Sequence, residues 1–135
     1  MKLIRLSDDF YRTYGACKEI LEKESRPYMC LTIRIDDIEY ALPIRHHFKH
    51  PYGFHTLGEA GIDYTKAIPI IDKSFIDNST PRIESAEWRI LKRNENRIYN
   101  QFRKYLKTYK RAKLNPENER NANILRCSSL QHFDI

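Results

Sequence analysis

The sequence predicts an α+β protein in which a small antiparallel β-sheet is covered by a long amphipathic helix near the C-terminus. Two runs rich in β-branched and aromatic residues, 28–35 and 38–44, are separated only by Asp36 and Asp37, a polar break typical of a hairpin turn. From Ser85 onward, apolar residues recur at helical spacing. A chain of 135 residues with 41% hydrophobic content can bury one core, so we expect a single domain over residues 1–114.

The first elements are short. Residues 2–7, "KLIRLS", predict a strand, and Ser7 then suits the N-cap of a brief helix over 8–14. Gly15 suits the end of that helix. Residues 17–25, "CKEILEKES", predict another helical turn or two before the hairpin.

The hairpin is followed by a long predicted loop from Arg45 to about Tyr64. Residues 66–71, "KAIPII", then predict a buried strand. Pro69 within this strand has no N–H to donate to a neighbouring strand, so we expect the strand to lie at an edge of the sheet or to carry a bulge.

One long amphipathic helix is predicted from Ser85. Its apolar stripe, which we expect to lie in the core, consists of Trp88, Leu91, Ile98, Phe102, Tyr105, Leu106 and Tyr109. Residues 89–113 contain ten Lys and Arg but only one acidic residue, Glu95, so the outer face should be basic. Residues 115–135 are Asn-rich and predict a polar, loosely held C-terminal tail.

Composition narrows the possible functions. The chain has 24 Lys and Arg against 18 Asp and Glu, a net charge of +6, which favours a polyanionic partner. The three cysteines are widely spaced and contain no CxxC, so we expect reduced thiols. The sequence has no run of about 18 apolar residues and its N-terminus is too polar for a signal peptide, which predicts a cytoplasmic protein with no membrane partner.

The loop after the hairpin, within "YALPIRHHFKHPYGFHT" at 40–56, concentrates cationic and imidazole side chains. A zinc site would need three or four of its histidines to converge, but Arg45 and Lys49 would repel the metal, and the cluster contains no Cys or carboxylate. We therefore expect no metal and no cofactor. The cluster is either a set of solvated loop residues or a phosphate-binding site whose imidazoles can transfer protons.

RNA cleavage is a reaction that suits these residue types. The 2'-hydroxyl of RNA is an internal nucleophile, so an enzyme needs only a base, an acid and positive groups around the phosphorus. Arg45, Lys49 and the neighbouring histidines can fill these roles, which makes metal-independent RNA cleavage a hypothesis.

The chain also resembles a known family over residues 1–109. The residues that carry the resemblance are "MKLIRLSDDFY", "RPYMCLTIRIDDIEYALPIR", "KHPYGFHT", "GIDYTKAIPI" and "AEWRI", in this order. They are similar to the endoribonuclease toxins of type III toxin-antitoxin systems, the ToxN/AbiQ superfamily, and most of all to its shorter TenpN-like branch.

This resemblance implies a compact, twisted antiparallel β-sheet or small barrel, akin to the Kid and MazF toxins, with helices packed around it. The implied activity is metal-independent RNA cleavage that leaves a 2',3'-cyclic phosphate. It also implies two kinds of RNA partner. One is cellular or phage RNA as substrate, and the other is an RNA antitoxin of pseudoknotted repeat units that inhibits the toxin in a closed protein–RNA assembly. The implied role is phage defence by abortive infection.

The resemblance places Arg26 and Lys66 at basic positions of the family's active groove. The longer toxins have a Thr-Ser pair and then Lys after the hairpin, where this chain has Arg45 and His46, so hydroxyl-assisted roles do not transfer. The predicted catalytic residues are Arg26, Arg45, His46, Lys49, His50 and Lys66, with the choice between His46 and His50 left open. The predicted RNA-binding residues are Lys23, Tyr28, Tyr52, His55, Tyr64, Thr65, Arg93, Arg97, Lys104, Lys107 and Arg111. Asp63 is interpreted as a residue that caps or turns the chain.

Two alternatives remain open on the sequence. A non-catalytic RNA-binding module would explain the basic helix and the aromatic residues. A protein-inhibited, MazF-like mRNA interferase would share the chemistry but should be encoded beside a small acidic protein. A tandem-repeat array upstream of the gene would instead favour the RNA-inhibited toxin.

Overall fold

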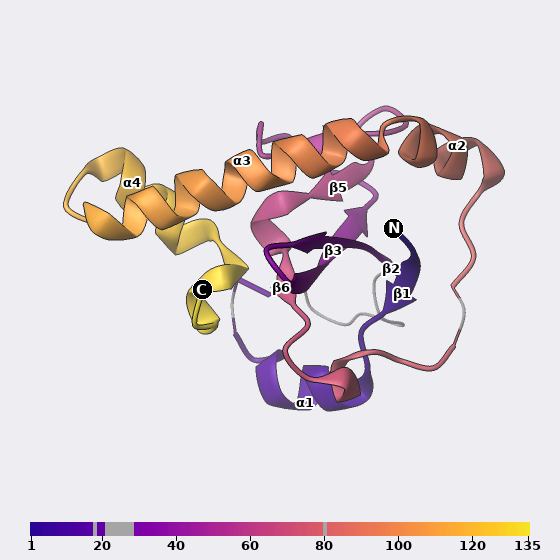
Figure 1. Cartoon of the computed structure of the whole chain (residues 1–135), viewed down its shortest axis with the longest axis horizontal. Helices are drawn as coiled ribbons and strands as arrows, with labels where there is room; N and C mark the ends of the chain where they lie inside the picture. The colour runs from indigo at the N-terminus through magenta and orange to yellow at the C-terminus, as the bar shows by residue number, and fades with distance from the viewer. Residues whose placement is uncertain (18, 21–28, 80) are drawn as a thin grey trace.

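The computed structural model describes residues 1–17, 19–20, 29–79 and 81–135. Within these residues, six strands form an open antiparallel sheet and four α-helices pack around it (Figure 1). The strands are β1 (Leu3–Arg5), β2 (Met29–Ile35), β3 (Ile38–Arg45), β4 (Gly53–His55), β5 (Gly61–Asp63) and β6 (Ile68–Pro69). The helices are α1 (Asp8–Tyr14), α2 (Ser85–Arg93), α3 (Glu95–Leu114) and α4 (Glu119–Cys127). Three 3₁₀ turns are η1 (Tyr64–Lys66), η2 (Lys73–Phe75) and η3 (Ser129–His132).

The predicted hairpin is confirmed as β2 and β3. Their register pairs Ile35 with Ile38 and Ile33 with Tyr40. Asp36 and Asp37 form the two-residue turn, with φ of 49° and 66°. Two consecutive residues with positive φ are typical of the tight hairpin turn whose twist matches that of the strands, and Asp tolerates this conformation better than most residues.

The predicted N-terminal strand and helix are also confirmed. β1 pairs with β2, and the Ser7 hydroxyl caps α1 by accepting the Phe10 N–H at 3.2 Å. Gly15 follows the last residue of α1, as predicted. The helical turns predicted over 17–25 lie largely outside the described residues.

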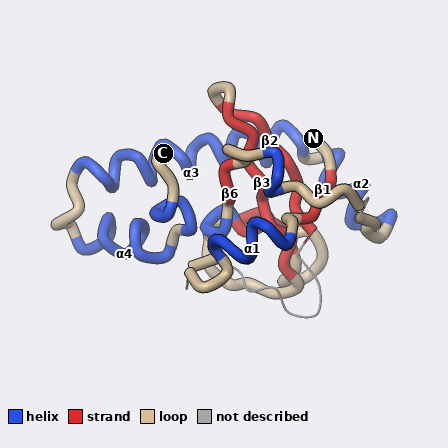
Figure 2. Tube along the Cα trace, turned by 90° about the horizontal axis from the view of Figure 1, so that it is seen from below, coloured by secondary structure: helices blue, strands red, loops and turns tan. Residues whose placement is uncertain are grey.

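Two hydrophobic clusters cover the two faces of the sheet, because successive strand residues point to opposite sides. Leu31 and Leu42 pack with the buried side of α3, and their chain neighbours Cys30 and Ala41 pack with Phe10 of α1. Figures 1 and 2 show α3 and α1 on opposite sides of the sheet. The domain is therefore three layers, with the sheet in the middle.

The predicted loop from Arg45 to Tyr64 was wrong in part, because it contains β4 and β5. β5 pairs with the end of β3, matching Ile44 with Ile62, and β4 pairs with β5. Each of these strands has only three residues, too few for a recognisable alternation. The strands form an open sheet with the order β1-β2-β3-β5-β4, and β6 pairs with β3 beside this path.

Pro69 lies in the two-residue strand β6, opposite Tyr40 of β3. Among the strands of the described residues, β6 pairs only with β3, so the predicted edge position is confirmed. The missing N–H of Pro69 therefore costs the sheet no hydrogen bond on the outer side.

The single long helix predicted from Ser85 is two helices, α2 and α3, which are separated at Asn94. Asn94 has φ of −107° and ψ of 19°, and its side-chain amide donates to the Ile90 carbonyl at 2.8 Å. This contact competes with continuation of the helix. The predicted apolar stripe of α3 is buried, as expected, while Trp88 of α2 is only partly buried. No helix in the described part of the chain is long and apolar enough to cross a membrane.

The C-terminal residues 115–135 are ordered, in contrast to the predicted loose tail. Asn118 caps α4, which folds back beside α3 (Figure 1). Leu130 is fully buried, and the hydroxyl of Ser129 donates to the Ala67 carbonyl at 2.6 Å. The apolar side chains of α4 and η3 thus anchor this polar segment on the domain.

Candidate functional site

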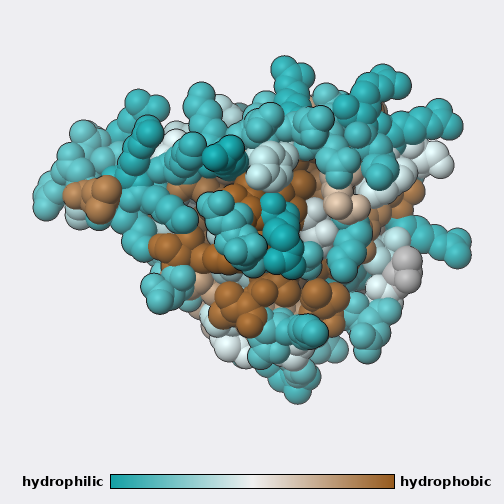
Figure 3. All heavy atoms as spheres, viewed as in Figure 1, coloured by the Kyte–Doolittle hydropathy of each residue, from teal (hydrophilic) through white to brown (hydrophobic). Residues whose placement is uncertain are grey.

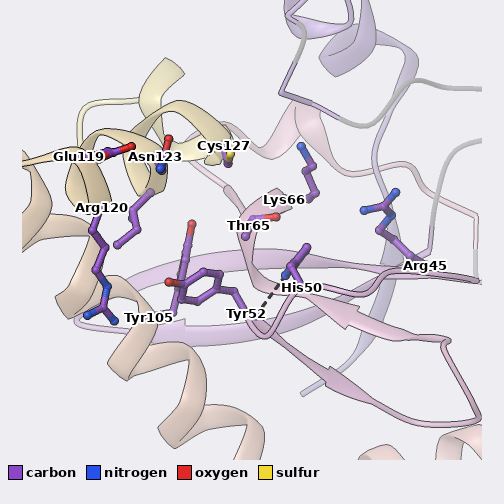
Figure 4. A pocket seen from close by; sticks show the side chains of 11 residues that line it. Arg45, His50, Tyr52, Thr65, Lys66, Tyr105, Glu119, Arg120, Asn123 and Cys127 are labelled. Atoms are coloured by element: carbon purple, nitrogen blue, oxygen red, sulfur yellow. Dashed lines mark hydrogen bonds between the residues drawn. The ribbon is translucent and has the colours of Figure 1, made fainter.

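A pocket of about 720 Å³ lies in the described part of the chain. It lies between the end of β3, the β4–β5 region and α4 (Figure 4). The residues that line it are Arg45, His50, Tyr52, Thr65, Lys66, Tyr105, Glu119, Arg120, Asn123, Ile124 and Cys127. Three of the six predicted catalytic residues, Arg45, His50 and Lys66, are in this set.

A buried carboxylate, Asp63, connects these groups. Asp63 ends β5 and is fully buried. Its Oδ1 accepts the backbone N–H of Thr65 at 3.0 Å and the Thr65 hydroxyl at 2.6 Å, and its Oδ2 accepts Nη1 of Arg45 at 2.8 Å. The interpretation of Asp63 as a capping residue is confirmed, and the structure adds an ion pair.

The strand register explains why Arg45 reaches Asp63. Arg45 lies opposite Gly61, so the two residues share a face of the sheet, and Asp63 lies on that face two positions further along β5. The Arg45 side chain is 29% exposed and lines the pocket.

His50 approaches the same carboxylate from the loop before β4. Its Nδ1 accepts the N–H of Tyr52 at 3.1 Å, and its Nε2 lies 3.0 Å from Oδ1 of Asp63. The ring N–H does not point at the oxygen closely enough for a hydrogen bond, so we treat this contact as electrostatic. Because Nδ1 accepts a hydrogen bond, the neutral ring carries its proton on the buried Nε2.

Two opposing effects act on the pKa of Asp63. Burial favours the neutral acid and raises this pKa, whereas hydrogen bonds and charge from His50, Thr65 and Arg45 lower it. The second effect is larger, so the pKa lies below its ordinary value. Asp63 is therefore a carboxylate at neutral pH, and it fixes the positions of Arg45 and His50.

Lys66 brings a second cation to the pocket at the end of η1. Its Nζ donates to the Glu19 carbonyl at 2.8 Å. Burial lowers the pKa of Lys66 because it disfavours the charged amine, although nearby Asp63 partly offsets this effect. The pocket thus combines a guanidinium, an amine that releases its proton more readily than usual, and an imidazole.

The other residues of the His-rich loop lie elsewhere. His46 is exposed and does not line the pocket, and Lys49 is 74% exposed with its Nζ 3.9 Å from Glu59. His47 also pairs with Glu59, and His55 stacks on Phe48 with ring centroids 4.3 Å apart. Among the described residues, no three His, Cys, Asp or Glu side chains are grouped to hold a metal ion.

The structure sorts the predicted RNA-binding residues. Tyr52 and Thr65 line the pocket, whereas Tyr64 is 3% exposed in the core and its hydroxyl contacts Gln101, so it cannot stack on a base in this arrangement. The five predicted RNA-binding cations of α2 and α3 are all exposed: Arg93, Arg97, Lys104, Lys107 and Arg111. On the face shown in Figure 3, hydrophilic side chains project along α3. The predictions for Lys23, Arg26 and Tyr28 lie outside the described residues.

Sequence reasoning missed the wall that α4 contributes. Glu119, Arg120, Asn123, Ile124 and Cys127 of α4 line the pocket, and Tyr105 of α3 lies beside them. A local signal was present, since Asn118 is a good N-cap and Ile124 with Leu125 is an apolar pair in the run that follows. The sequence contained no signal that this helix folds back onto η1.

Comparison with protein-family models, with curated proteins and with solved structures finds no match for this chain. The case for a function therefore depends on the pocket itself. A concave site with three basic side chains, Arg45, Lys66 and Arg120, together with an imidazole and a half-buried tyrosine, is suited to a phosphate that carries an aromatic base.

Proposed function

We propose that the chain is a metal-independent endoribonuclease, the toxin of a type III toxin-antitoxin system that acts in phage defence by abortive infection. The observation that carries this proposal is that Arg45, His50 and Lys66 line one pocket, with Arg45 and His50 held by the buried Asp63. The observed α+β architecture with an antiparallel sheet is compatible with the resemblance to the ToxN/AbiQ superfamily. The more specific Kid- and MazF-like fold that the resemblance implies is part of the proposal.

The proposed reaction uses the RNA's own nucleophile. The 2'-oxygen attacks the adjacent phosphorus and loses its proton to a base, while the bond from phosphorus to the 5'-oxygen breaks and that oxygen gains a proton from an acid. The products are a 2',3'-cyclic phosphate and a 5'-hydroxyl. Arg45 and Lys66 stabilise the extra negative charge on the phosphoryl oxygens as the reaction proceeds.

His50 is the best candidate for the base, because an imidazole has an ordinary pKa near neutrality and His46 is outside the pocket. It would release the Tyr52 N–H from Nδ1 and take the 2'-proton there. Asp63 beside Nε2 would stabilise the imidazolium that forms. Lys66, with its lowered pKa, is then the candidate acid for the 5'-oxygen.

The exposed cations of α2 and α3 support the second half of the proposal, an inhibitory RNA partner. Arg97, Lys107 and Arg111 are exposed along α3, away from the core. Such a row suits the phosphates of a folded RNA. In this proposal, the pseudoknotted repeat units bind along α3 and cover the pocket in a closed protein–RNA assembly.

Cleavage by the purified protein tests the proposal. Single-stranded RNA should be cut in excess EDTA to give 2',3'-cyclic phosphate ends. Arg45→Ala and Lys66→Ala should each lower the rate about a hundredfold, because each removes a charge partner of the transition state. Arg12→Ala is the matched control, since Arg12 lies on α1 and pairs with Asp9.

Lys49→Ala tests whether Lys49 is catalytic, as the sequence predicted, or lies outside the active site, as its position in the structure indicates. Because Lys49 is exposed and lies near Glu59, its loss should have little effect on cleavage if the pocket is the active site. Loss of activity with chelator and recovery with a divalent metal would contradict the mechanism. RNA binding without cleavage would favour the non-catalytic RNA-binding module. Inhibition of the cleavage by a small acidic protein would favour the MazF-like alternative.

A further inference from the structure

A second, smaller pocket of about 350 Å³ lies beside the first. One side is formed by residues 51–53 at the start of β4, and the other by Gln101, Lys104 and Thr108 of α3. It shares Tyr52, Tyr105 and Arg120 with the first pocket. The two pockets therefore adjoin along these three side chains and form one groove.

The boundary between the pockets is aromatic. The rings of Tyr52 and Tyr105 have centroids 5.9 Å apart at an interplanar angle of 56°. Tyr105 is buried and its hydroxyl donates to Ser128 at 2.9 Å, so its ring is fixed, whereas Tyr52 is half-buried. A half-buried ring held against a fixed one is a platform on which an unpaired base can stack.

The second pocket has its own cations. Lys104 lines it from α3, and Arg120 lines both pockets from the first turn of α4. Both side chains belong to exposed residues, and within the described part of the chain neither makes an ion pair. Two unpaired cations beside an aromatic platform suit a phosphate group.

We propose that this second pocket is a subsite for the nucleotide next to the cleaved bond. A single strand of RNA crosses Tyr52, with its reacting phosphate against Arg45 and Lys66 and an adjacent phosphate against Lys104 and Arg120. The volume of about 350 Å³ lies in the range of small-molecule sites, roughly 300–1,000 Å³. This inference rests on the proposed endoribonuclease function and identifies which residues bind beyond the cleaved bond.

The test compares strands that differ in their number of phosphates. A dinucleotide has one phosphate, whereas a tetranucleotide has a flanking phosphate on each side of the central one. Strands with 2'-fluoro sugars have no 2'-hydroxyl nucleophile, so binding can be measured by displacement of a labelled strand whether or not the protein cuts RNA. The wild-type protein should bind the tetranucleotide about tenfold more tightly than the dinucleotide.

Lys104→Ala with Arg120→Ala should remove this gain. Because Arg120 also lines the first pocket, binding of the dinucleotide is compared with Lys104→Ala alone, which should leave it nearly unchanged. A tetranucleotide with neutral methylphosphonates at both flanking positions should bind no better than the dinucleotide and should be insensitive to the two substitutions. Lys110→Ala with Arg103→Ala is the matched control, because it removes the same charge from the opposite flank of α3, where both residues line a different pocket.

The outcomes separate the two proposals. If the wild-type protein cuts RNA but gains nothing from flanking phosphates, or the control pair removes the gain equally, the subsite is overturned and the endoribonuclease proposal stands. If the gain depends on Lys104 and Arg120 but no RNA is cut, the groove binds strands and the catalytic proposal fails. Melting curves for each variant show whether its fold is retained.

Discussion

Asp63 is the residue on which the arrangement of the pocket depends. It is fully buried, yet it contacts a guanidinium and an imidazole that both reach the pocket. A buried anion is costly unless it is paired and hydrogen-bonded, and here Arg45 and Thr65 satisfy both oxygens. The same contacts that make Asp63 tolerable in the core therefore hold Arg45 at the pocket.

Replacing Asp63 by Asn should separate its charge from its capping role. Asn also caps well, so η1 should persist, but Arg45 loses its anionic partner. We expect a loss of about 2 kcal/mol in unfolding free energy, at the low end for a broken buried pair because Arg45 is partly exposed. RNA cleavage should fall at least about tenfold.

Asp72→Asn is the matched control for this change. Asp72 caps η2 with the same contact, accepting the Ser74 N–H at 2.9 Å, but it is exposed. Its replacement should alter stability and cleavage little. Equal losses in the two variants, measured by urea unfolding, would show that Asp63 acts only as a cap.

The stability that Asp63 provides should also depend on pH. Its pKa is lower in the folded than in the unfolded chain, so its contribution is complete above the unfolded pKa of about 3.9 and is lost as pH falls through the folded value. The difference in melting temperature between wild type and Asp63→Asn should therefore be constant from pH 7 to about pH 5 and shrink below about pH 4.

At the scale of elements, the β4–β5 hairpin depends on Gly61. Its φ is +156°, and a Cβ at this position would lie 2.1 Å from the Phe54 carbonyl oxygen of the neighbouring strand. Only glycine allows β4 to approach β5 this closely. The hairpin in turn places Asp63 beside Arg45.

Gly61→Ala should therefore destabilise the protein by about 3 kcal/mol, because the clash is with backbone and cannot be relieved by a side-chain rotation. Cleavage should fall with it, since Asp63 moves away from Arg45. Gly58→Ala is the control: φ is +60°, but a Cβ there would have open space, so only the cost of a left-handed residue, about 1 kcal/mol, is expected. Similar melting temperatures for both variants would contradict this account of the hairpin.

For the whole molecule, the balance of charge matters more than any single contact. The net charge of the chain is +6, and residues 89–113 hold ten of its Lys and Arg but only one acidic residue. These cations are exposed because the apolar side of α3 faces the core. If a folded RNA lies along α3, these residues would replace counterions of its phosphates and release them into solution, so binding should weaken steeply with salt.

Reversing Arg97, Lys107 and Arg111 to Glu should weaken binding of a long or folded RNA. The log–log slope of affinity against salt should flatten by about two units or more, at roughly 0.7 per lost contact. Cleavage of a tetranucleotide should remain nearly unchanged, because none of the three residues lines the two pockets.

The control reverses three exposed cations on other elements, Lys2, Arg12 and Lys73, which gives the same net charge. If this control flattens the slope equally, the effect is one of overall charge and α3 is only a polar cover over the core. Salt titrations of both variants with the same RNA make the comparison.

The sequence by itself determined the elements whose stability is local. The β2–β3 hairpin, its Asp-Asp turn, the Ser7 cap and the buried stripe of α3 all follow from alternation, backbone preference or helical period, which act over a few residues. The sequence also marked Arg45 and His50 as candidates, because their chemistry is visible without a fold, whereas Lys66 was marked by the family resemblance.

Only the tertiary structure decided which candidates meet. Contacts between distant residues decide that His50 lines the pocket and His46 does not. They also place Lys49 near Glu59, bury Tyr64 in the core and add α4 to the lining of the pocket. The break at Asn94 and the three-residue strands β4 and β5 likewise come from contacts that a short window does not contain. The physical reason is that a buried charge such as Asp63 is stabilised by partners 18 positions away along the chain, which the fold alone brings within hydrogen-bond distance.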